Sequence, residues 1–586
     1  MPDITLPQQI KRIRVWYAVI ALIACIFVVR LFYLQIIRND YYQNAARSKQ
    51  LKEYAIPAER GVIYARDGAG KTPLVLNEMR YTLFADPKFI TKHAEVAKQL
   101  SQVTGAKMSQ YEELLKADSR YVVLAKKLDK ETKEEIEKLD LLGVGLREAP
   151  QRAYPQEGLA AQVLGFVNDA GDGKYGIEQY LHESLKGSSG QLRAITDANG
   201  VPLVGNDDNV LTEPKKGTDV TLTIDIGMQR QLEEKLKSGL MNAQSKSGSA
   251  LILEAKTGAI KAMANYPSYK PAEFYKQKDI TAFTNPAISS PYEVGSVMKP
   301  LTLAAALDQG VVNRNTTYYD PGYIKLDDAT ITNVQEVAGS GTRTMPDILR
   351  QSLNTGATWL LMQMGGGEVN EQARKNWYEY MTKKYRFGSM SGVEQGYESG
   401  GSVPHPTDGF GLNIQYANTS FGQGMTATPL QMASALATIV NGGTYYKPYL
   451  VDSLTNASGV VETTQPKIVQ SQAIKKSSSA TIKSIMEDVF KQNYPLYGMK
   501  TLRKEYSVGG KSGTPEITKP GGGYYENKFN GSFMGFVGGD EPQYVIYVRV
   551  NEPGIPGYAG AKAAAPIFVD LTEMLLDNFG VTPKSS

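Results

Sequence analysis

The stretch Gly295-Ser296-Val297-Met298-Lys299-Pro300 opens an apolar run that extends through 301–307. Proline is tolerated in the first turn of a helix, where its missing N–H leaves no hydrogen bond unmade. Gly310 follows the run at a position that suits a helix C-cap. The sequence therefore predicts a helix with Ser296 at its start and Lys299 in its first turn.

That placement suits nucleophilic chemistry. Backbone N–H groups and the positive end of the helix dipole would face an oxyanion that develops beside Ser296. Lys299 lies three residues later and therefore on the same helix face, and burial favours the neutral amine that a general base requires. The alternative is an ordinary N-cap serine with a surface lysine, because Ser-x-x-Lys also occurs by chance.

Two further motifs follow in the chain. Ser352-Leu353-Asn354 stands at a predicted boundary between a helix and a loop, where a hydroxyl can pass a proton and an amide can bind a carbonyl. Gly510-Lys511-Ser512-Gly513-Thr514 offers charge and a hydroxyl to an anionic substrate terminus, and its glycines would allow a ligand to approach a strand closely. A similar tripeptide, Lys246-Ser247-Gly248, is interpreted as a loop.

Composition narrows the classes of function. The chain has 586 residues, of which 42% are hydrophobic and 21% charged, as expected of a folded protein with two or more domains. Its net charge of +4 is spread without a basic run, so nucleic-acid binding is not indicated. One cysteine and three scattered histidines give little material for a disulfide, a metal site or a histidine-based triad. We expect no metal and no cofactor.

The N-terminal segment decides the compartment. An apolar stretch over residues 15–37, interrupted by Arg30, has the length that a helix needs to cross about 30 Å of hydrocarbon. Three basic residues precede it, which predicts a cytoplasmic tail over 1–14 and an exterior position for the rest. A cleaved signal peptide is the main alternative, but its apolar region would be shorter.

The exterior part divides at about residue 216. Residues 38–215 are a polar mixture of strand-like pieces, over 61–64, 81–84 and 121–124, and a charged helical stretch over 127–139. Beyond Gly217 the pattern predicts strands, then a long helical block, then strands again, which favours an α+β domain. The expected strands lie at 220–224, 250–253, 259–264 and 545–550, and the expected helices at 227–240, 301–307, 345–364, 430–440 and 563–578.

The three motifs, in this order, are the signature of the penicillin-binding proteins and class A β-lactamases. The chain resembles class B penicillin-binding proteins over nearly its whole length. Arg60-Gly61-Val62-Ile63-Tyr64-Ala65-Arg66-Asp67-Gly68 resembles a motif of that family's pedestal, although Ala65 stands where an aspartate is usual. Further similar segments are Arg152-Ala153-Tyr154-Pro155, Gly176-Ile177-Glu178, Leu222-Thr223-Ile224-Asp225, Phe421-Gly422-Gln423-Gly424 and Thr428-Pro429-Leu430-Gln431.

The resemblance implies a cytoplasmic tail (1–14), a transmembrane anchor (15–37), a pedestal domain of the dimerisation type (38–215) and a transpeptidase domain (216–586). The transpeptidase domain would be an antiparallel sheet flanked by helices, with an all-helical subdomain. Its catalytic residues would be Ser296, Lys299, Ser352 and Asn354, and its substrate-binding residues Lys511, Ser512, Gly513 and Thr514.

The resemblance also implies a function and partners. The expected activity is peptidoglycan D,D-transpeptidation through an acyl-enzyme on Ser296, in septal wall synthesis, with β-lactams as covalent inhibitors. Expected partners are peptidoglycan stem peptides, lipid-linked nascent strands, a membrane glycosyltransferase of the shape-elongation-division-sporulation type and other cell-wall proteins.

Several alternatives stay open at this point. A D,D-carboxypeptidase or an elongation-type transpeptidase would use the same residues, and a catalytically silent cell-wall scaffold is the alternative from another class. A phosphate loop over 65–72 is disfavoured because the residues after it look extended, whereas such a loop must open a helix.

Overall fold

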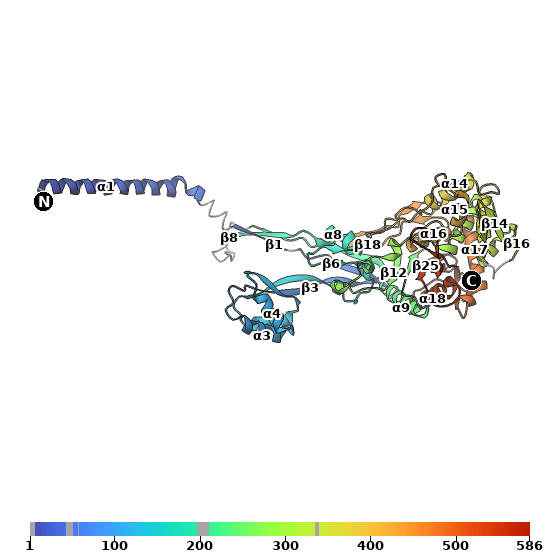
Figure 1. The fold of residues 1–586 in the computed structure, drawn as a ribbon, viewed down its shortest axis with the longest axis horizontal. Coiled ribbons are helices and arrows are strands. Elements are labelled where there is room, and N and C mark those ends of the chain that lie inside the picture. Colours follow the sequence, from blue (N-terminus) through green and yellow to red (C-terminus); the bar gives the residue numbers. More distant parts are fainter. Residues whose placement is uncertain (1–5, 43–50, 57, 196–209, 334–338, 586) are drawn as a thin grey trace. The chain divides into compact units, whose positions relative to one another are not determined.

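The computed structural model describes residues 6–42, 51–56, 58–195, 210–333 and 339–585. The chain forms two compact units, one of Met1–Glu59 with Gly187–Lys216 and one of Arg60–Lys186 with Gly217–Ser586. Figure 1 traces both from the N-terminus to the C-terminus.

The first unit contains the apolar helix. Its elements are α1 (Leu6–Phe32), a π-helical turn η1 (Tyr33–Ile37), and an antiparallel sheet in the order β1 (Leu51–Ile56), β8 (Gly190–Ile195) and β9 (Val210–Thr212). Among the described residues, Arg12–Ile37 is the one helical segment long and apolar enough to cross a membrane. Its apolar side chains are exposed, as those of a helix that meets lipid must be.

The second unit opens with a mixed sheet of seven strands. Along the sheet these are β19 (Val461–Thr463), β18 (Val451–Thr455), β10 (Asp219–Asp225), β2 (Ile63–Asp67), β3 (Gly70–Ala85) and β4 (Val122–Leu128), with β5 (Val144–Ala153) also paired to β3. The helices α3 (His93–Thr104), α4 (Met108–Leu115) and α5 (Lys130–Lys138) share a small apolar core with β3 and β4. The short elements that follow are α6 (Ala161–Leu164), β6 (Phe166–Val167), β7 (Gly173–Lys174), α7 (Gly176–Tyr180) and α8 (His182–Lys186).

Most of the predicted elements in this region are confirmed, with two differences. Residues 127–139 are not one helix, because β4 continues to Leu128 before α5 begins. The strand predicted over 220–224 exists as β10, but it pairs with β2 and β18 and is no part of the five-stranded sheet described next. The turn between β2 and β3 joins antiparallel strands, which rules out the phosphate-loop alternative there.

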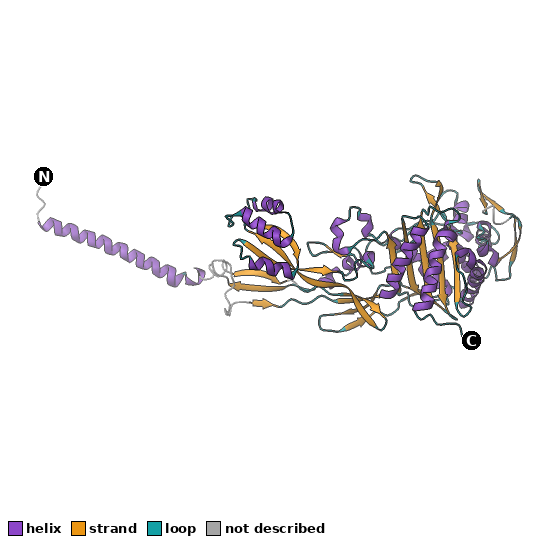
Figure 2. Cartoon of the chain, turned by 90° about the horizontal axis from the view of Figure 1, so that it is seen from below, coloured by secondary structure: helices purple, strands orange, loops and turns teal. Residues whose placement is uncertain are grey.

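A five-stranded antiparallel sheet forms the centre of the rest of this unit. Its order is β12 (Ile260–Tyr266), β11 (Ser247–Glu254), β25 (Pro542–Asn551), β24 (Gly531–Gly538) and β21 (Ser507–Gly513). Ser247 and Gly248 begin β11, so the loop predicted for the tripeptide at 246–248 is wrong. The α+β prediction of an antiparallel sheet flanked by helices is confirmed, as Figure 2 shows.

Both faces of this sheet are buried because alternate side chains point to opposite faces of each strand. Leu251 and Tyr547 belong to one apolar core, which also holds residues of α11 (Lys299–Gln309) and α16 (Pro429–Val440). Ile252 and Ile546 belong to a second core, which also holds residues of α9 (Ile226–Asn242) and α18 (Ala565–Asn578).

The helical block lies between β12 and β21 in the sequence. It contains α12 (Met345–Arg350), α13 (Asn354–Gln363), α14 (Glu371–Glu379), η5 (Tyr380–Lys384), α15 (Leu412–Thr419), α16 and α17 (Lys476–Asn493). The single helix predicted over 345–364 is wrong, because the chain leaves the helical conformation at Ser352, whose φ is +56°. That break falls at the predicted position of the second motif.

Short elements complete the unit. They are η2 (Pro271–Lys276), η3 (Ile280–Phe283), α10 (Pro286–Ser289), η4 (Gly295–Met298), β13 (Thr317–Asp320), β14 (Tyr323–Leu326), β15 (Ala329–Thr332), β16 (Gly341–Thr344), β17 (Tyr445–Tyr446), β20 (Ile468–Gln470), η6 (Tyr494–Tyr497), β22 (Glu516–Thr518), β23 (Tyr524–Phe529) and η7 (Gly560–Ala564).

Candidate active site

Ser296 lies in a 3-10 turn, η4, that runs directly into α11. Gly295 before it has a φ of +66°, and a Cβ at that position would lie 3.1 Å from Pro515, so the backbone there favours glycine. Pro300 occupies the first turn of α11, and Gly310 ends the helix in the left-handed conformation, as the sequence predicts. The nucleophile candidate therefore sits at the start of a helix that is buried over residues 299–308.

The Lys299 amine is surrounded by oxygen atoms. Its Nζ lies 3.0 Å from Ser296 Oγ, 3.2 Å from Ser352 Oγ and 2.8 Å from Asn354 Oδ1. It also donates to the carbonyl oxygen of Ser352 at 2.5 Å. The first and second motifs thus meet at one nitrogen atom.

Burial sets the protonation of this amine. Lys299 is fully buried, and burial holds the pKa of its amine well below that of an ordinary lysine, with the positive charge of Lys511 lowering it further. A neutral amine has a lone pair that accepts the hydroxyl proton of Ser296, which is the property that a general base needs. The pKa of Lys511, also buried, is lowered by burial to about 7.

The second motif is held by strained backbone and by a buried polar network. The left-handed conformation of Ser352 turns both its carbonyl and its hydroxyl towards Lys299. Asn354 starts α13, and its side-chain N–H donates to the carbonyl of Thr332 at 3.1 Å, which leaves Oδ1 facing the amine. The hydrogen bonds from Lys299 to Ser352 and Asn354 compensate the backbone strain at Ser352.

Three buried side chains that we did not predict support the start of α13. Thr355 Oγ1 donates to Asp320 at 2.8 Å, and Asn333 donates to Thr355 Oγ1 at 2.7 Å and to Asp320 at 3.1 Å. Thr355 stands next to the motif in sequence, but Asp320 and Asn333 come from other segments. No local pattern connects them to the site.

The third motif lies on the edge strand β21, beside the nucleophile segment. A Cβ at Gly513 would lie 3.1 Å from the carbonyl oxygen of Val294 and 3.2 Å from Val297 Cγ1, so β21 and η4 are in close contact. Lys511 is almost fully buried and donates to the carbonyl of Ser512 at 2.7 Å. The hydroxyl of Thr514 accepts a hydrogen bond from Gly560 N–H at 3.0 Å.

The expectation that Gly510 makes room for a ligand is wrong. A Cβ at Gly510 would lie 2.5 Å from the ring of Phe533, and one at Gly509 would lie 2.5 Å from the ring of Phe536. Both glycines make room for aromatic side chains of the neighbouring strand β24. Their role is to pack the sheet that carries Lys511.

A second set of unpredicted residues borders the nucleophile segment. Glu293 Oε1 accepts from Gly424 N–H at 3.0 Å, and Glu293 Oε2 accepts from the Tyr524 hydroxyl at 2.9 Å. Gln423 donates to Glu516 at 2.9 Å. The sequence signal that points to them is their position, since Glu293 precedes the first motif by three residues and Glu516 follows the third.

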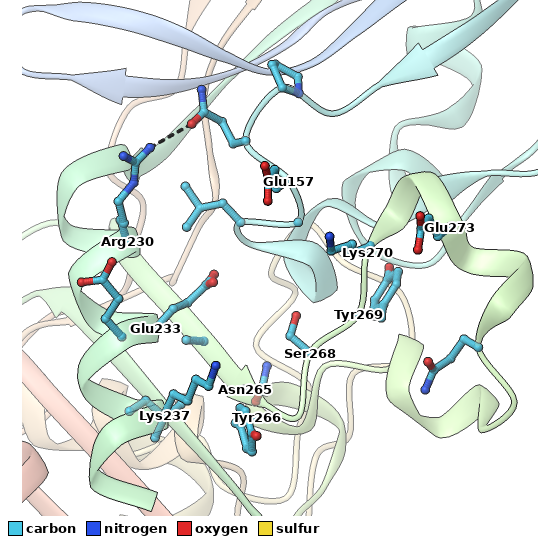
Figure 3. A pocket seen from close by; sticks show the side chains of 18 of the residues that line it. Glu157, Arg230, Glu233, Lys237, Asn265, Tyr266, Ser268, Tyr269, Lys270 and Glu273 are labelled. Atoms are coloured by element: carbon cyan, nitrogen blue, oxygen red, sulfur yellow. Dashed lines mark hydrogen bonds between the residues drawn. The ribbon is translucent and has the colours of Figure 1, made fainter. Parts of the chain in front are cut away.

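A separate cavity of about 850 Å³ lies between residues 155–159 and α9. Figure 3 shows Glu233 and Lys237 of α9 on one side of it and Glu157 and Lys270 across from them. Acidic and basic side chains alternate around its wall, so the lining does not favour ligands of one charge. None of the three motifs contributes to it.

Metal-binding groups do not gather in the part of the chain that the structure describes. No three or more histidine, cysteine, aspartate or glutamate side chains meet there in a ligand-like cluster.

Family models match two successive parts of the chain after the apolar helix. Residues 248–573 match the penicillin binding protein transpeptidase domain, and residues 55–222 match the penicillin-binding protein dimerisation domain. The segment that carries all three motifs lies within the first match.

Individual relatives match this chain over almost its full length. Stage V sporulation protein D of Bacillus subtilis is 30% identical, over 95% of this chain and 84% of the relative. Peptidoglycan D,D-transpeptidase FtsI of Escherichia coli is 26% identical, over 95% of this chain and 90% of the relative. The crystal structure of penicillin binding protein 2X from Streptococcus thermophilus shares the fold, with a TM-score of 0.72, 24% identity, and coverage of 91% of this chain and 83% of that one.

The N-terminal apolar helix and these relationships together indicate that this chain is a single-pass membrane protein. The chain belongs to the class B penicillin-binding proteins, the serine D,D-transpeptidases of peptidoglycan synthesis.

Proposed function

We propose that Ser296 is the nucleophile of this transpeptidase and Lys299 its general base. Ser296 Oγ attacks the carbonyl of the penultimate D-Ala of a stem peptide, an Oγ–C bond forms, and the C–N bond to the terminal D-Ala breaks. The serine proton passes to Lys299, and Ser352 helps to move it to the leaving amine. The observation that supports this most strongly is the fully buried Lys299 amine 3.0 Å from Ser296 Oγ.

The second half-reaction makes the cross-link. An amine of a neighbouring strand attacks the ester carbonyl of the acyl-enzyme, a new C–N amide bond forms, and the Oγ–C bond to Ser296 breaks. The proton that the amine loses passes through Lys299 to the released Ser296 oxygen. Backbone N–H groups of Ser296 and Thr514 form the oxyanion hole for both tetrahedral intermediates.

The remaining motif residues bind the substrate. Asn354 holds the acyl chain through its amide, and the Lys511 ammonium group and the Ser512 hydroxyl bind the terminal carboxylate. Gly513 supplies strand backbone beside the substrate. The buried position of Lys511 favours this role, because an ammonium group in a low-dielectric site attracts a carboxylate strongly. β-Lactams carry a carboxylate beside a reactive amide and would acylate Ser296 in the same way.

The N-terminal segment bears on where the enzyme works. Lys11, Arg12 and Arg14 lie in α1 just before its apolar stretch, which favours a cytoplasmic tail over 1–14, an anchor over 15–37, and an extracytoplasmic pedestal (38–215) and transpeptidase domain (216–586). Lipid-linked nascent strands would supply the stem peptides. We propose a membrane glycosyltransferase of the shape-elongation-division-sporulation type and other cell-wall proteins as partners, in septal synthesis.

The test uses the purified full chain with a stem-peptide donor and an amine acceptor, and follows D-Ala release and cross-linked product together. A transpeptidase releases D-Ala and forms the cross-linked dimer, and Ser296→Ala loses both. D-Ala release without dimer would establish a D,D-carboxypeptidase instead. Neither product from the wild-type chain would favour a silent scaffold.

A further inference from the structure

Glu293 joins two segments of the chain that lie far from it in sequence. One of its carboxylate oxygens accepts from Gly424 N–H at 3.0 Å, and the other accepts from the Tyr524 hydroxyl at 2.9 Å. Gly424 belongs to the loop 421–424 after α15, and Tyr524 begins β23 in the hairpin that follows the third motif. The carboxylate therefore connects the nucleophile segment to both.

The same loop and hairpin meet at a second point. Gln423 donates from its amide to Glu516 at 2.9 Å. On its other side, the loop approaches the nucleophile segment closely, because Gly295 N–H donates to the carbonyl of Gly422 at 3.0 Å and a Cβ at Gly422 would lie 2.2 Å from the carbonyl oxygen of Gly295. The loop is thus held between the nucleophile segment and the hairpin.

This arrangement fixes the backbone on both sides of the proposed oxyanion hole. Ser296 directly follows Gly295, and Gly295 packs against Pro515, which directly follows Thr514. The carbonyl of Pro515 accepts from Asn530 N–H at 3.0 Å, which closes the base of the β22–β23 hairpin. Movement of the hairpin would therefore shift Thr514 N–H relative to Ser296 N–H.

A carboxylate suits this position better than an amide does. Glu293 offers two acceptor oxygens to two donors, whereas a glutamine offers one oxygen and an N–H₂ group that cannot accept from Gly424 N–H or the Tyr524 hydroxyl. Glutamine has nearly the same shape, so the substitution removes an acceptor without opening a cavity.

We infer that Glu293 is a positioning residue that sets the separation of the two oxyanion-hole donors by tying the β22–β23 hairpin and the loop 421–424 to the nucleophile segment. This inference rests on the proposed function. It assigns to Glu293 no contact with the substrate, and it predicts an effect on the acylation step rather than on binding.

The experiment measures acylation of the purified full chain by a fluorescent penicillin as a function of its concentration. This separates the acylation rate constant from the half-saturating concentration. We expect Glu293→Gln to lower the acylation rate constant about tenfold, less than the roughly 10²–10³-fold loss seen when an oxyanion donor is removed outright. The half-saturating concentration should stay unchanged. Tyr524→Phe should lower the same rate constant, and the double variant should be no slower than Glu293→Gln.

The matched control is Glu526→Gln, which removes an equal charge from an exposed position of the same hairpin and should acylate like the wild type. Wild-type rate constants in both Glu293→Gln and Tyr524→Phe would overturn the inference, and so would effects of the two that multiply in the double variant. If Glu293→Gln melts at a lower temperature than the wild type, the acylation rate constant of Tyr524→Phe, which keeps the carboxylate, decides the test. If the wild-type chain itself takes up no penicillin, the proposed function has failed and not this inference alone.

Discussion

Two regions of the second unit bury ionisable groups, and they do so in opposite ways. In the first, Glu178 is fully buried between Arg60 and Arg152, with Arg60 Nε and Arg152 Nε each 2.8 Å from a carboxylate oxygen. In the second, Lys299 and Lys511 are buried, and neither has an ion pair with a carboxylate among the residues that the structure describes.

The difference separates a structural site from a chemical one. A buried ion with opposite charges around it holds its segments together, and removal of one partner leaves an uncompensated charge. A buried amine without such a partner gives up its proton more readily, and its reactivity changes accordingly. We therefore expect substitutions at Glu178 to affect stability and substitutions at Lys299 to affect catalysis.

Lys299→Met tests the chemical side of the comparison and should have the largest effect. Methionine fills the space of the lysine stem without an amine, so acylation by penicillin should fall about 10²–10⁴-fold, the usual contribution of a general base. The free energy of unfolding should be unchanged or higher, because an unpaired buried amine is removed. Stopped-flow labelling and thermal melts measure the two quantities. Lys491→Met, at an exposed site of α17, is the control.

Glu178→Gln tests the structural side. The variant leaves two buried arginines without their carboxylate, so the free energy of unfolding should fall by about 3–5 kcal/mol. Urea titration measures this loss, and acylation per folded molecule should stay near the wild-type rate. Glu183→Gln removes a charge from an exposed pair in the same region and should leave the free energy of unfolding near the wild-type value. Equal losses in the two variants would contradict the comparison.

Lys511→Arg tests the buried amine that binds the carboxylate. Because burial lowers the pKa of Lys511 to about 7, the free enzyme carries an ammonium group below that pH and a neutral amine above it. The acylation efficiency of the wild type should fall as pH rises above about 7, by up to tenfold per pH unit. Arginine stays charged throughout this range, so the variant should lack this fall, whatever its absolute rate. The same fall in both would exclude Lys511 as its cause.

Gly510→Ala should have the smallest effect, on packing beneath Lys511. The added methyl group would overlap the ring of Phe533, and overpacking of this kind costs about 1–3 kcal/mol of stability. Gly339→Ala, where nothing lies within 4 Å of the new methyl group, is the matched control. Equal melting temperatures for the two variants would show that β24 adjusts to the added volume.

Local patterns predicted the elements that local physics governs. Pro300 and Gly310 marked the limits of the nucleophile helix because proline and glycine have restricted or special backbone conformations. The break at Ser352 was not predicted as a left-handed residue, because nothing in a serine requires that conformation and only the surrounding contacts impose it. The pairing of β10 with β2 also depends on contacts between distant segments, which periodicity does not encode.

The same limit applies to the site. The order of three short motifs identified the residues around Lys299, because each residue type is needed by the chemistry. The carboxylate of Glu293 was missed because its partners, Gly424 and Tyr524, are distant in the sequence. The family-like segment 421–424 contains Gly424, but nothing in that segment indicates a contact with Glu293.

The most direct test of the account is the mass of the intact protein after incubation with benzylpenicillin, followed by mapping of the modified peptide. We expect one covalent penicillin per wild-type chain, attached to the peptide that contains Ser296, and no adduct on a folded Ser296→Ala variant. An adduct on another residue, or equal modification of the two proteins, would contradict it.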